Sequence, residues 1–270
     1  MQKTILITGS TDGIGLESAK ALIKQGDNVL IHGRSSLKVK KVQELLSKLF
    51  DGKNIQGYVA DLSNIDEIKA FIKEIKTKYQ KLDVLINNAG IYKTSESITK
   101  DGIDIRFAVN TIAPYVLTKE LAPLLDKSSR VINLSSAAQA PIDLEALKGK
   151  IKLDDAKAYA QSKLGVIMWS NFLAKKFEND IGVIVSLNPA SFLGSKMVKE
   201  AYGMSGKDIN IGVDIITRMA LLDQFSDVSG KYFDNDIAEF TSPHADALDM
   251  QKCKNIVDTI ESILSSSLKI

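Results

Sequence analysis

The chain has 270 residues, 44% of them hydrophobic, and a formal net charge of +2. This length and apolar content suffice for one α/β domain with a full core, so we interpret residues 1–270 as a single domain. The small net charge argues against a nucleic-acid or other polyanionic partner. Because Cys253 is the only cysteine, an intrachain disulfide is excluded and a reducing compartment, the cytoplasm, is expected.

We expect three further features to be absent: a signal peptide, a transmembrane anchor and a metal site. A signal peptide is not apparent, since a strand and a glycine-rich loop begin almost at the first residue. No apolar run has the length that crosses a bilayer, so we expect no transmembrane anchor. His32 and His244 are the only histidines and lie near no other obvious metal ligand, so both are interpreted as structural or surface residues and no metal site is predicted.

The first element is a short apolar run at residues 3–8, rich in β-branched side chains, which predicts a buried strand. A helix is predicted from about Ile14 to Gly26. The loop between them has glycines that permit a tight turn and let backbone amides approach a pyrophosphate. A plain connecting turn is the alternative, but strand, loop and helix occur in the order that a phosphate-binding turn requires. The loop residues predicted to bind the cofactor are Gly9, Ser10, Thr11, Gly13, Ile14 and Gly15.

Strands and helices continue to alternate along the rest of the chain. The predicted strands cover residues 28–33, 55–60, 84–87, 131–134, 183–187 and 231–233. The predicted helices cover residues 37–50, 65–79, 103–125 with an interruption at Pro114, a segment through Tyr159 to 177, and a final segment after Pro243. This alternation predicts an α/β fold with one doubly wound, Rossmann-type parallel sheet and helices on both faces.

Tyr159 and Lys163 are four residues apart, so they share one face of a predicted helix. A lysine ammonium there would lower the pKa of the phenol and make it a usable acid or base. Taken alone, the pair is better explained by a packed tyrosine and a solvated lysine, because short motifs often arise by chance. The glycine loop at the N-terminus reverses that preference.

Several short motifs occur along the chain in a fixed order: Thr8-Gly9, Gly13-Ile14-Gly15, Asp61, Asn87-Asn88-Ala89-Gly90, Asn110, Ser135-Ser136, Tyr159 and Lys163. Together these motifs resemble the classical short-chain dehydrogenase/reductase family over nearly the whole length. The sequence around Asn110 and Pro114, and the stretch at 231–233, resemble the branch that includes retinol dehydrogenases and protochlorophyllide reductases.

The resemblance implies an enzyme that moves a hydride between a nicotinamide and a carbonyl or alcohol carbon. Tyr159 would be the general acid and base, and its phenol pKa would have to fall by roughly three units, about 4 kcal/mol, to act near neutrality. Lys163 would lower that pKa and bind the nicotinamide ribose. Ser136 would hydrogen-bond the substrate oxygen, and Asn110 would hold a helix bend and a water in the proton path. Ser135, its neighbour on the strand, is expected to point away and bond to backbone.

The choice of cofactor depends on the residue that follows the second strand. An acid there would hydrogen-bond the ribose hydroxyls of NAD(H), whereas this chain has Arg34 and Ser35. A guanidinium suits a 2′-phosphate in charge and geometry, so NADP(H) is preferred. Interpreting Arg34 as a surface residue at a turn leaves NAD(H) as the alternative.

Further cofactor contacts are implied along the chain. Asp61, with Leu62, would accept a hydrogen bond from the adenine amino group, although Asp61 could instead cap the helix near Ile65. The small residues Asn88, Ala89 and Gly90 would run along the adenine ribose. After the sixth strand the family often has Pro-Gly and then a hydroxyl residue, but this chain has Pro189 and Ala190. The hydroxyl could therefore come from Ser191 or Ser195.

The segment 190–212 is predicted to be a substrate lid, with Gly203 and Gly206 giving it mobility. Its apolar side chains, including Met197, Val198 and Tyr202, could line a lipophilic pocket or simply pack as an ordinary helix. The expected partner is therefore a small-molecule carbonyl or alcohol, with a lipophilic one favoured by the first interpretation. A homo-oligomer is a further expectation. The alternative function is a catalytically idle dinucleotide-binding sensor or scaffold.

Overall fold

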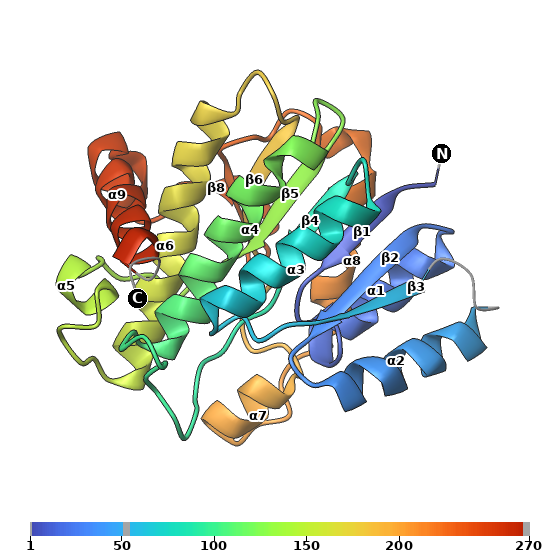
Figure 1. The fold of residues 1–270 in the computed structure, drawn as a ribbon, viewed down its shortest axis with the longest axis horizontal. Coiled ribbons are helices and arrows are strands. Elements are labelled where there is room, and N and C mark those ends of the chain that lie inside the picture. Colours follow the sequence, from blue (N-terminus) through green and yellow to red (C-terminus); the bar gives the residue numbers. More distant parts are fainter. Residues whose placement is uncertain (1, 51–54, 267–270) are drawn as a thin grey trace.

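The computed structural model describes residues 2–50 and 55–266, and a central sheet organises this part of the chain. Figure 1 shows the sheet, whose eight strands follow the order β3-β2-β1-β4-β5-β6-β7-β8. The strands are β1 (Thr4–Ile7), β2 (Asn28–Gly33), β3 (Ile55–Val59), β4 (Val84–Asn87), β5 (Arg130–Leu134), β6 (Val183–Asn188), β7 (Tyr232–Asp234) and β8 (Glu239–Thr241).

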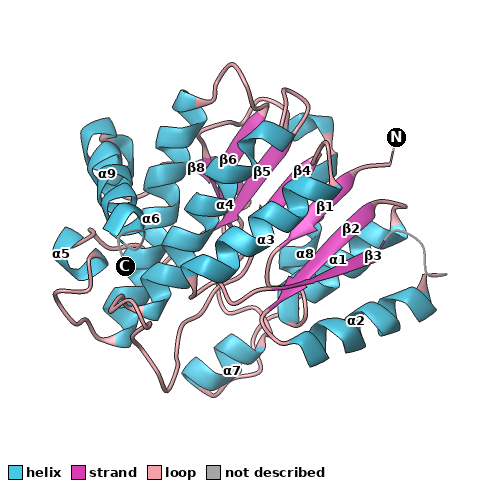
Figure 2. Cartoon of the chain, in the orientation of Figure 1, coloured by secondary structure: helices cyan, strands magenta, loops and turns pink. Residues whose placement is uncertain are grey.

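Helices connect the strands and cover the sheet, as Figure 2 shows. The α-helices are α1 (Gly13–Lys24), α2 (Ser36–Leu49), α3 (Ile65–Lys78), α4 (Ala113–Leu121), α5 (Leu144–Leu147), α6 (Asp155–Lys176), α7 (Lys196–Tyr202), α8 (Asn210–Leu221) and α9 (Met250–Ser266). Shorter helical turns are η1 (Phe107–Ile112), η2 (Ala122–Leu124), η3 (Asp223–Phe225) and η4 (Ala245–Leu248).

Two hydrophobic cores lie on opposite faces of the sheet. Leu6 of β1 belongs to the core formed with α3, α4 and α6, whereas Ile5 and Ile7 belong to the core formed with α1, α2 and α8. This division follows from the pleat, because neighbouring side chains of a strand point to opposite faces. Helix α9 packs on the outer side of α6. The predicted doubly wound α/β fold is confirmed.

The last strand departs from the predicted parallel sheet. β1 to β7 pair in parallel, but β8 runs antiparallel to β7 and forms an edge hairpin with it. All three residues of β8 are exposed, and three residues are too few for the apolar run or alternation by which a sequence reveals a strand.

The predicted interruption at Pro114 takes the form of a π-helical turn. Pro114 lies in the first turn of α4, where a residue without an N–H is tolerated, and η1 precedes it. The N–H of Ala113 donates to the carbonyl of Ala108, five residues back, which is the π-helical pattern. The widened turn carries Asn110, so the bend falls where a candidate functional residue lies.

The order of the strands predicts where a ligand would bind. β1 lies between β2 and β4, so the chain leaves the carboxyl end of β1 toward one side of the sheet and later returns to the other side. In open parallel sheets, ligands bind in the crevice that opens at such a switch point. The glycine loop follows β1, and Asn88-Ala89-Gly90 follows β4, so both flank this crevice.

Candidate active site

The glycine loop packs directly against the turn that follows β4. At Gly9, whose φ is +64°, an added Cβ would lie 2.8 Å from the Cα of Ala89. At Gly15 it would lie 2.5 Å from the carbonyl oxygen of Gly9. Asn88 holds the two turns together, since its Nδ2 donates to the carbonyls of Thr8 (2.8 Å) and Gly9 (3.0 Å). These glycines are therefore required by close backbone approach.

His32, near the end of β2, holds the glycine loop in place through a hydrogen bond to its backbone. Its ring is buried, stacks on Phe71, and accepts at Nδ1 from the N–H of Gly9 (3.2 Å). The opposite nitrogen, Nε2, lies 3.1 Å from the carbonyl oxygen of Ala60, which requires a proton on Nε2. Burial lowers the pKa of His32 to about 4, so the ring is neutral at physiological pH. The interpretation of His32 as a structural residue is confirmed.

Most of the predicted site residues converge on one cavity of about 560 Å³ at the carboxyl edge of the sheet. Those that line it are Gly9, Thr11, Gly13, Ile14, Gly15, Arg34, Asp61, Leu62, Asn88, Ala89, Gly90, Ser136, Tyr159, Lys163, Pro189 and Ser191. Ser10, Ser35 and Asn110 lie next to it without lining it. The predicted site residues that line the cavity therefore come from segments up to 182 residues apart, from Gly9 to Ser191.

Ser10 and Ser35 make local contacts. The side chain of Ser10 is buried, donates to the carbonyl of Ile7 (2.9 Å) and accepts from the N–H of His32 (2.9 Å). Ser35 caps α2 by accepting from the N–H of Lys38 (3.4 Å). Both hydroxyls thus shape the two turns, and their predicted contact with a cofactor stays a prediction.

Helix α6 carries Tyr159 and Lys163 into the cavity. Its N-cap is Asp154, which accepts from the N–H of Lys157 (2.8 Å). Lys163 is only 5% exposed, and its Nζ donates to the carbonyl of Leu134 (2.9 Å) at the end of β5. The same Nζ lies 5.7 Å from the centre of the Tyr159 ring. Burial lowers the pKa of the Lys163 ammonium to about 8, so at pH 7 most molecules keep the charge.

The two serines after β5 have different partners. Ser135 donates from Oγ to the carbonyl of Lys163 (2.8 Å), which confirms that it bonds to backbone. Ser136 lines the cavity, and its Oγ accepts from the N–H of Ala138 (3.1 Å), which leaves its proton available to a ligand. The Tyr232 hydroxyl donates to the Ser136 carbonyl (3.2 Å) and so fixes the backbone at this point.

Asn110 binds the segment that forms one wall of the cavity. Its Nδ2 donates to the carbonyl of Ile91 (3.0 Å), and its Oδ1 accepts from the N–H of the same residue (2.8 Å). Nδ2 also donates to Ser162 Oγ (2.9 Å), on the helix that carries Tyr159. Because Asn110 is 2% exposed, its amide acts here as a clamp between two segments.

Asp61 and Arg34 lie at the end of the cavity near β2 and β3. Asp61 accepts at Oδ1 from the N–H (2.9 Å) and the hydroxyl (2.7 Å) of Ser63, and α3 is capped by Asn64. Asp61 is therefore not the cap of this helix, which was the alternative to a ligand contact. Arg34 is exposed where β2 ends, and its side chain borders the cavity.

The loop after β6 is held in a strained conformation. Ala190 has a φ of +127° and Phe192 a φ of +57°, and residues other than glycine rarely adopt positive φ values. Asp236 fixes the loop, because it accepts from the N–H (2.9 Å) and the hydroxyl (2.5 Å) of Ser191. Ser195 instead caps α7, and its Cβ is the atom nearest to a Cβ built on Gly13, at 3.9 Å. Both serines line the cavity, but the Ser191 hydroxyl donates to Asp236, whereas the Ser195 hydroxyl accepts from the N–H of Val198 (3.3 Å).

Some cavity residues were missed in the sequence. Tyr92, Lys93 and Thr94 line the cavity directly after Asn88-Ala89-Gly90, and the Tyr92 ring packs edge-on against Tyr159 with centroids 4.9 Å apart. Their position after the carboxyl end of β4 was the only signal, since residues at this edge of an open sheet contact ligands. Asp236 was missed because it lies 45 residues from the Ser191 that it binds.

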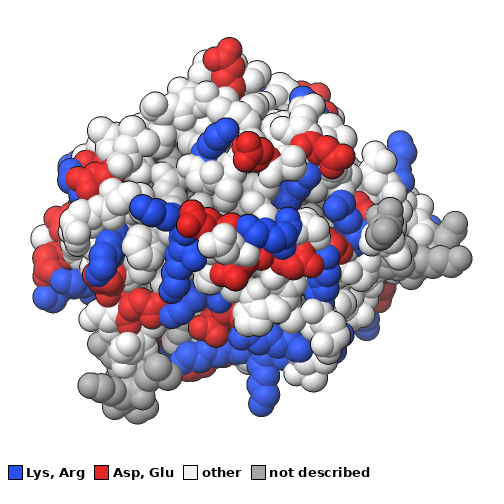
Figure 3. All heavy atoms as spheres, turned by 90° about the horizontal axis from the view of Figure 1, so that it is seen from above, with Lys and Arg blue, Asp and Glu red and all other residues white. Residues whose placement is uncertain are grey.

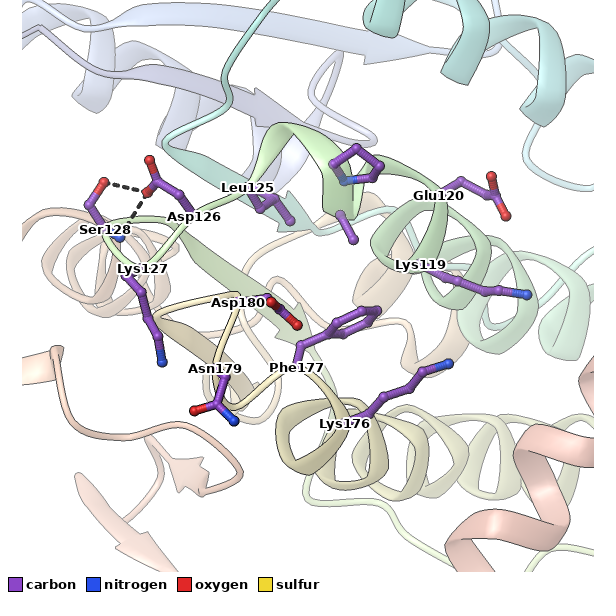
Figure 4. A pocket seen from close by; sticks show the side chains of 12 residues that line it. Lys119, Glu120, Leu125, Asp126, Lys127, Ser128, Lys176, Phe177, Asn179 and Asp180 are labelled. Atoms are coloured by element: carbon purple, nitrogen blue, oxygen red, sulfur yellow. Dashed lines mark hydrogen bonds between the residues drawn. The ribbon is translucent and has the colours of Figure 1, made fainter.

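A second, larger depression of about 910 Å³ lies at the opposite edge of the sheet. Figure 4 shows that it is formed by the segments that precede β5 and β6, with Lys127, Lys176 and Phe177 around it. Its cations have partners within the chain: Lys119 pairs with Glu261 (2.6 Å), and Lys176 lies over the Phe177 ring. It contains none of the motif residues, so the smaller cavity is the candidate active site.

Across residues 2–50 and 55–266, none of the helices has both the length and the apolar character that crossing a bilayer takes. The same ranges contain no group of three or more His, Cys, Asp or Glu residues arranged to hold a metal ion.

Comparisons with known proteins agree with this geometry. The model of the short chain dehydrogenase family matches residues 3–204. Retinol dehydrogenase 13 from Mus musculus is 30% identical over 90% of this chain and 79% of its own length. The short-chain dehydrogenase TIC 32 A, chloroplastic, from Brassica napus is 30% identical over 91% and 83%. A short chain dehydrogenase from Escherichia coli CFT073, solved as a complex with NADPH, has a TM-score of 0.70 and 23% identity over 86% and 96%.

The fold and site define a dinucleotide-binding oxidoreductase, and the chain belongs to the short-chain dehydrogenase family. Its similarity to retinol dehydrogenases confirms the predicted branch. The chain is accordingly an oxidoreductase that acts on CH–OH or C=O groups, which confirms the prediction of an enzyme.

Proposed function

We propose that this chain is an NADP(H)-dependent oxidoreductase that interconverts a carbonyl and an alcohol, with Tyr159 as general acid and base. The observation that carries the proposal is that Tyr159, Lys163 and Ser136 line the same cavity as the glycine loop. A protein that only sensed or stored a dinucleotide would not need a phenol acid beside a buried ammonium.

The residues around the cavity fit a dinucleotide phosphate. A Cβ built on Gly13 would meet nothing closer than Ser195 at 3.9 Å, so this part of the loop leaves room for a ligand at the N-terminus of α1. That end of the helix attracts anions. Arg34 borders the cavity at the place where NAD-binding proteins have an acid, and a guanidinium there suits a 2′-phosphate. The NADPH complex of the Escherichia coli protein with this fold supports the same choice.

Each part of the cofactor then has its own set of residues. Asp61 and Leu62 would bind the adenine, Arg34 and Ser35 the 2′-phosphate, and Asn88, Ala89 and Gly90 the adenine ribose. Tyr159, Lys163, Pro189 and Ser191 would bind the nicotinamide half. The glycine loop, which comprises Gly9, Ser10, Thr11, Gly13, Ile14 and Gly15, would bind the pyrophosphate.

When bound, the nicotinamide supplies or accepts the hydride. Tyr159 exchanges a proton with the substrate oxygen. Lys163, charged in most molecules at pH 7, favours the phenolate and so lowers the free energy of that transfer. Ser136 donates a hydrogen bond from its hydroxyl to the same oxygen. Asn110 keeps the Ile91 segment and the Tyr159 helix at a fixed separation through its amide.

We further propose a bulky, weakly polar substrate. Apolar side chains from three segments line the cavity: Ile91, Val109, Phe192, Met197 and Val198. Phe192 lines the cavity and is 47% exposed. Relatives of this chain are named retinol dehydrogenases, and retinol is a substrate of this character. The segment 190–212 would close over such a substrate as a lid and exclude water.

A screen of NADPH consumption tests the proposal. The purified chain is mixed with NADPH and, in turn, aldehydes, ketones, quinones and retinoids, and the screen is repeated with NADH. We expect consumption with at least one bulky, weakly polar carbonyl, and faster consumption with NADPH than with NADH. Tight NADPH binding without turnover of any carbonyl, or of NADP+ with the matching alcohols, would indicate an idle sensor instead.

A further inference from the structure

Arg106 is a buried cation that the proposed chemistry does not use. Its side chain is 1% exposed and forms a forked pair with Asp104, from Nε to Oδ1 (2.8 Å) and from Nη2 to Oδ2 (2.6 Å). A charge buried this deeply is tolerated only with paired hydrogen bonds. Asp104 precedes Arg106 by two residues, so this pair by itself joins nothing beyond the start of η1.

The remaining nitrogen of the fork reaches two other segments. Nη1 donates to the carboxylate of Asp155 and to the carbonyl of Tyr92 (3.4 Å). Asp155 is the first residue of α6, and Tyr92 lies in the wall that follows β4. One guanidinium therefore connects the start of η1, the first turn of α6 and the Tyr92 segment.

Two of these segments carry residues assigned to the reaction, and the third contacts one of them. Asn110 lies four residues after Arg106, in the π-helical turn. Tyr159 lies four residues after Asp155, one helical turn along the same face of α6. The Tyr92 ring packs against that of Tyr159, with centroids 4.9 Å apart. A shift of Arg106 would therefore reach the Tyr159 phenol by two routes, through helix α6 and through the Tyr92 ring.

We propose that Arg106 is a positioning residue that fixes the Tyr159 phenol relative to Asn110 and the Tyr92 wall. This inference rests on the function proposed above. Arg106 is not among the residues that line the cavity, so it acts through its partners and not by contact with a substrate. The planar fork of arginine makes directed hydrogen bonds to three residues at once, which a lysine ammonium on a flexible stem cannot reproduce. Misplacing a reacting group by about 1 Å can cost roughly 100-fold in rate.

Two neighbouring acids at the start of α6, the N-cap Asp154 and the first helical residue Asp155, provide a matched test. Asp155→Asn removes the charge that Arg106 binds, whereas Asp154→Asn removes an equal charge one residue earlier. Asp154 is bonded to Lys157, and asparagine caps helices as well as aspartate does. Both side chains are partly exposed, at 44% and 55%, so both variants are expected to fold.

We expect Asp155→Asn to lower kcat about tenfold or more, with the dissociation constant of NADPH changed less than about twofold. Asp154→Asn should leave both within about twofold of wild type. Arg106→Lys, which keeps the charge and loses the fork, should lower kcat as Asp155→Asn does. The cofactor-free variants are also compared by hydrogen exchange, in which amides 156–163 should exchange faster in Asp155→Asn than in Asp154→Asn.

An unchanged kcat in Asp155→Asn would overturn the proposal, even with faster exchange, because Arg106 would then only stabilise the helix. If wild type turns over no carbonyl, the proposed function fails on its own. The exchange comparison then decides about Arg106, and equal exchange in the two variants would exclude a positioning role.

Discussion

Arg34 is the side chain on which the proposed choice between NADPH and NADH depends. It borders the cavity where β2 ends, and the chain has no acid at that place. Arg34→Ala should weaken NADPH binding about 10- to 100-fold, because charge-assisted hydrogen bonds contribute about 1.5–3 kcal/mol. Binding of NADH, which lacks the 2′-phosphate, should change little.

Titration of both cofactors against wild type and Arg34→Ala measures this difference. Arg218→Ala serves as the control for the loss of a positive charge, since Arg218 pairs with Asp214 on α8 and does not line the cavity. Equal losses of affinity for NADPH and NADH in Arg34→Ala would remove the assignment.

His32 gives the protein a predictable sensitivity to acid. Its pKa is lowered from 6.5 to about 4 by burial, so the unfolded chain binds more protons between these values. The free energy of unfolding therefore does not depend on His32 protonation above pH 6.5. As the pH drops from 6.5 toward 4, protonation of His32 in the unfolded chain lowers that free energy by about 3 kcal/mol, at about 1.4 kcal/mol per pH unit. Urea unfolding at pH 7.5 and pH 4.5 should show a smaller loss in His32→Gln than in wild type. Equal losses in the two proteins would contradict this role for the ring.

Contacts between side chains that are distant in the sequence could not be predicted, whereas contacts within one helix could. Spacing alone placed Tyr159 and Lys163 on one helix face, because a helix fixes the geometry of residues four apart. Arg106 binds Asp155 across 49 residues, and Ser191 binds Asp236 across 45. Such contacts depend on how strands and helices pack, and no local pattern of residue types reveals them.

The loop between β6 and α7 is the element in which backbone strain is concentrated. Ala190 has a φ of +127°, where glycine is the residue without a steric penalty. Strain of this kind costs about 1–3 kcal/mol, and the greater freedom of glycine in the unfolded chain offsets about 0.4–1 kcal/mol of any gain. Ala190→Gly should therefore raise the free energy of unfolding by about 1 kcal/mol.

Chemical denaturation measures the effect of Ala190→Gly, with Ala70→Gly as the control. Ala70 is an exposed residue within α3, where glycine should lower the free energy of unfolding by about 1 kcal/mol. A loss of stability in both variants would show that the loop bears no strain at Ala190.

The predicted lid contains helix α7, and hydrogen bonds join the two chain segments that flank this helix. α7 is capped by Ser195 and ends at Gly203, whose φ is +70°. Below it, the N–H of Gly194 donates to the carbonyl of Lys207 (2.7 Å), and the N–H of Lys207 donates to that of Phe192 (2.7 Å). These contacts favour movement of the segment as a unit about its base.

Hydrogen exchange with and without NADPH tests whether the lid closes on a ligand. Amides of residues 196–211 should become more protected when NADPH binds, while those of α9, none of whose residues lines the cavity, stay unchanged. Strong protection of 196–211 in the cofactor-free protein would mean that the segment is fixed packing and not a lid.

Periodicity predicted most elements because buried strands and amphipathic helices leave strong patterns. It failed for β8, which has three exposed residues, and for α7, whose seven residues are too few to show a helical period. The π-helical form of η1 was also beyond the sequence, although Pro114 indicated that the helix would be interrupted there.

At the scale of the whole molecule, the two edges of the sheet differ in character. The carboxyl edge holds the motif residues, and the amino edge holds the open depression of Figure 4. On the face drawn in Figure 3, Lys and Arg are largely interleaved with Asp and Glu. Ion pairs such as Lys76–Glu120 and Lys81–Asp126 join neighbouring segments in this way. A homo-oligomeric state and a cytoplasmic location stay predictions.

Turnover by Tyr159→Phe, measured beside its affinity for NADPH, tests the central claim most directly. Phenylalanine keeps the ring that packs against Tyr92 and removes only the hydroxyl. We predict a fall in kcat of about 100-fold or more, with the dissociation constant of NADPH within about threefold of wild type, because proton transfer by a positioned acid contributes about 10²–10⁴ in rate. Turnover close to that of wild type would contradict the assignment of Tyr159 as the acid and base.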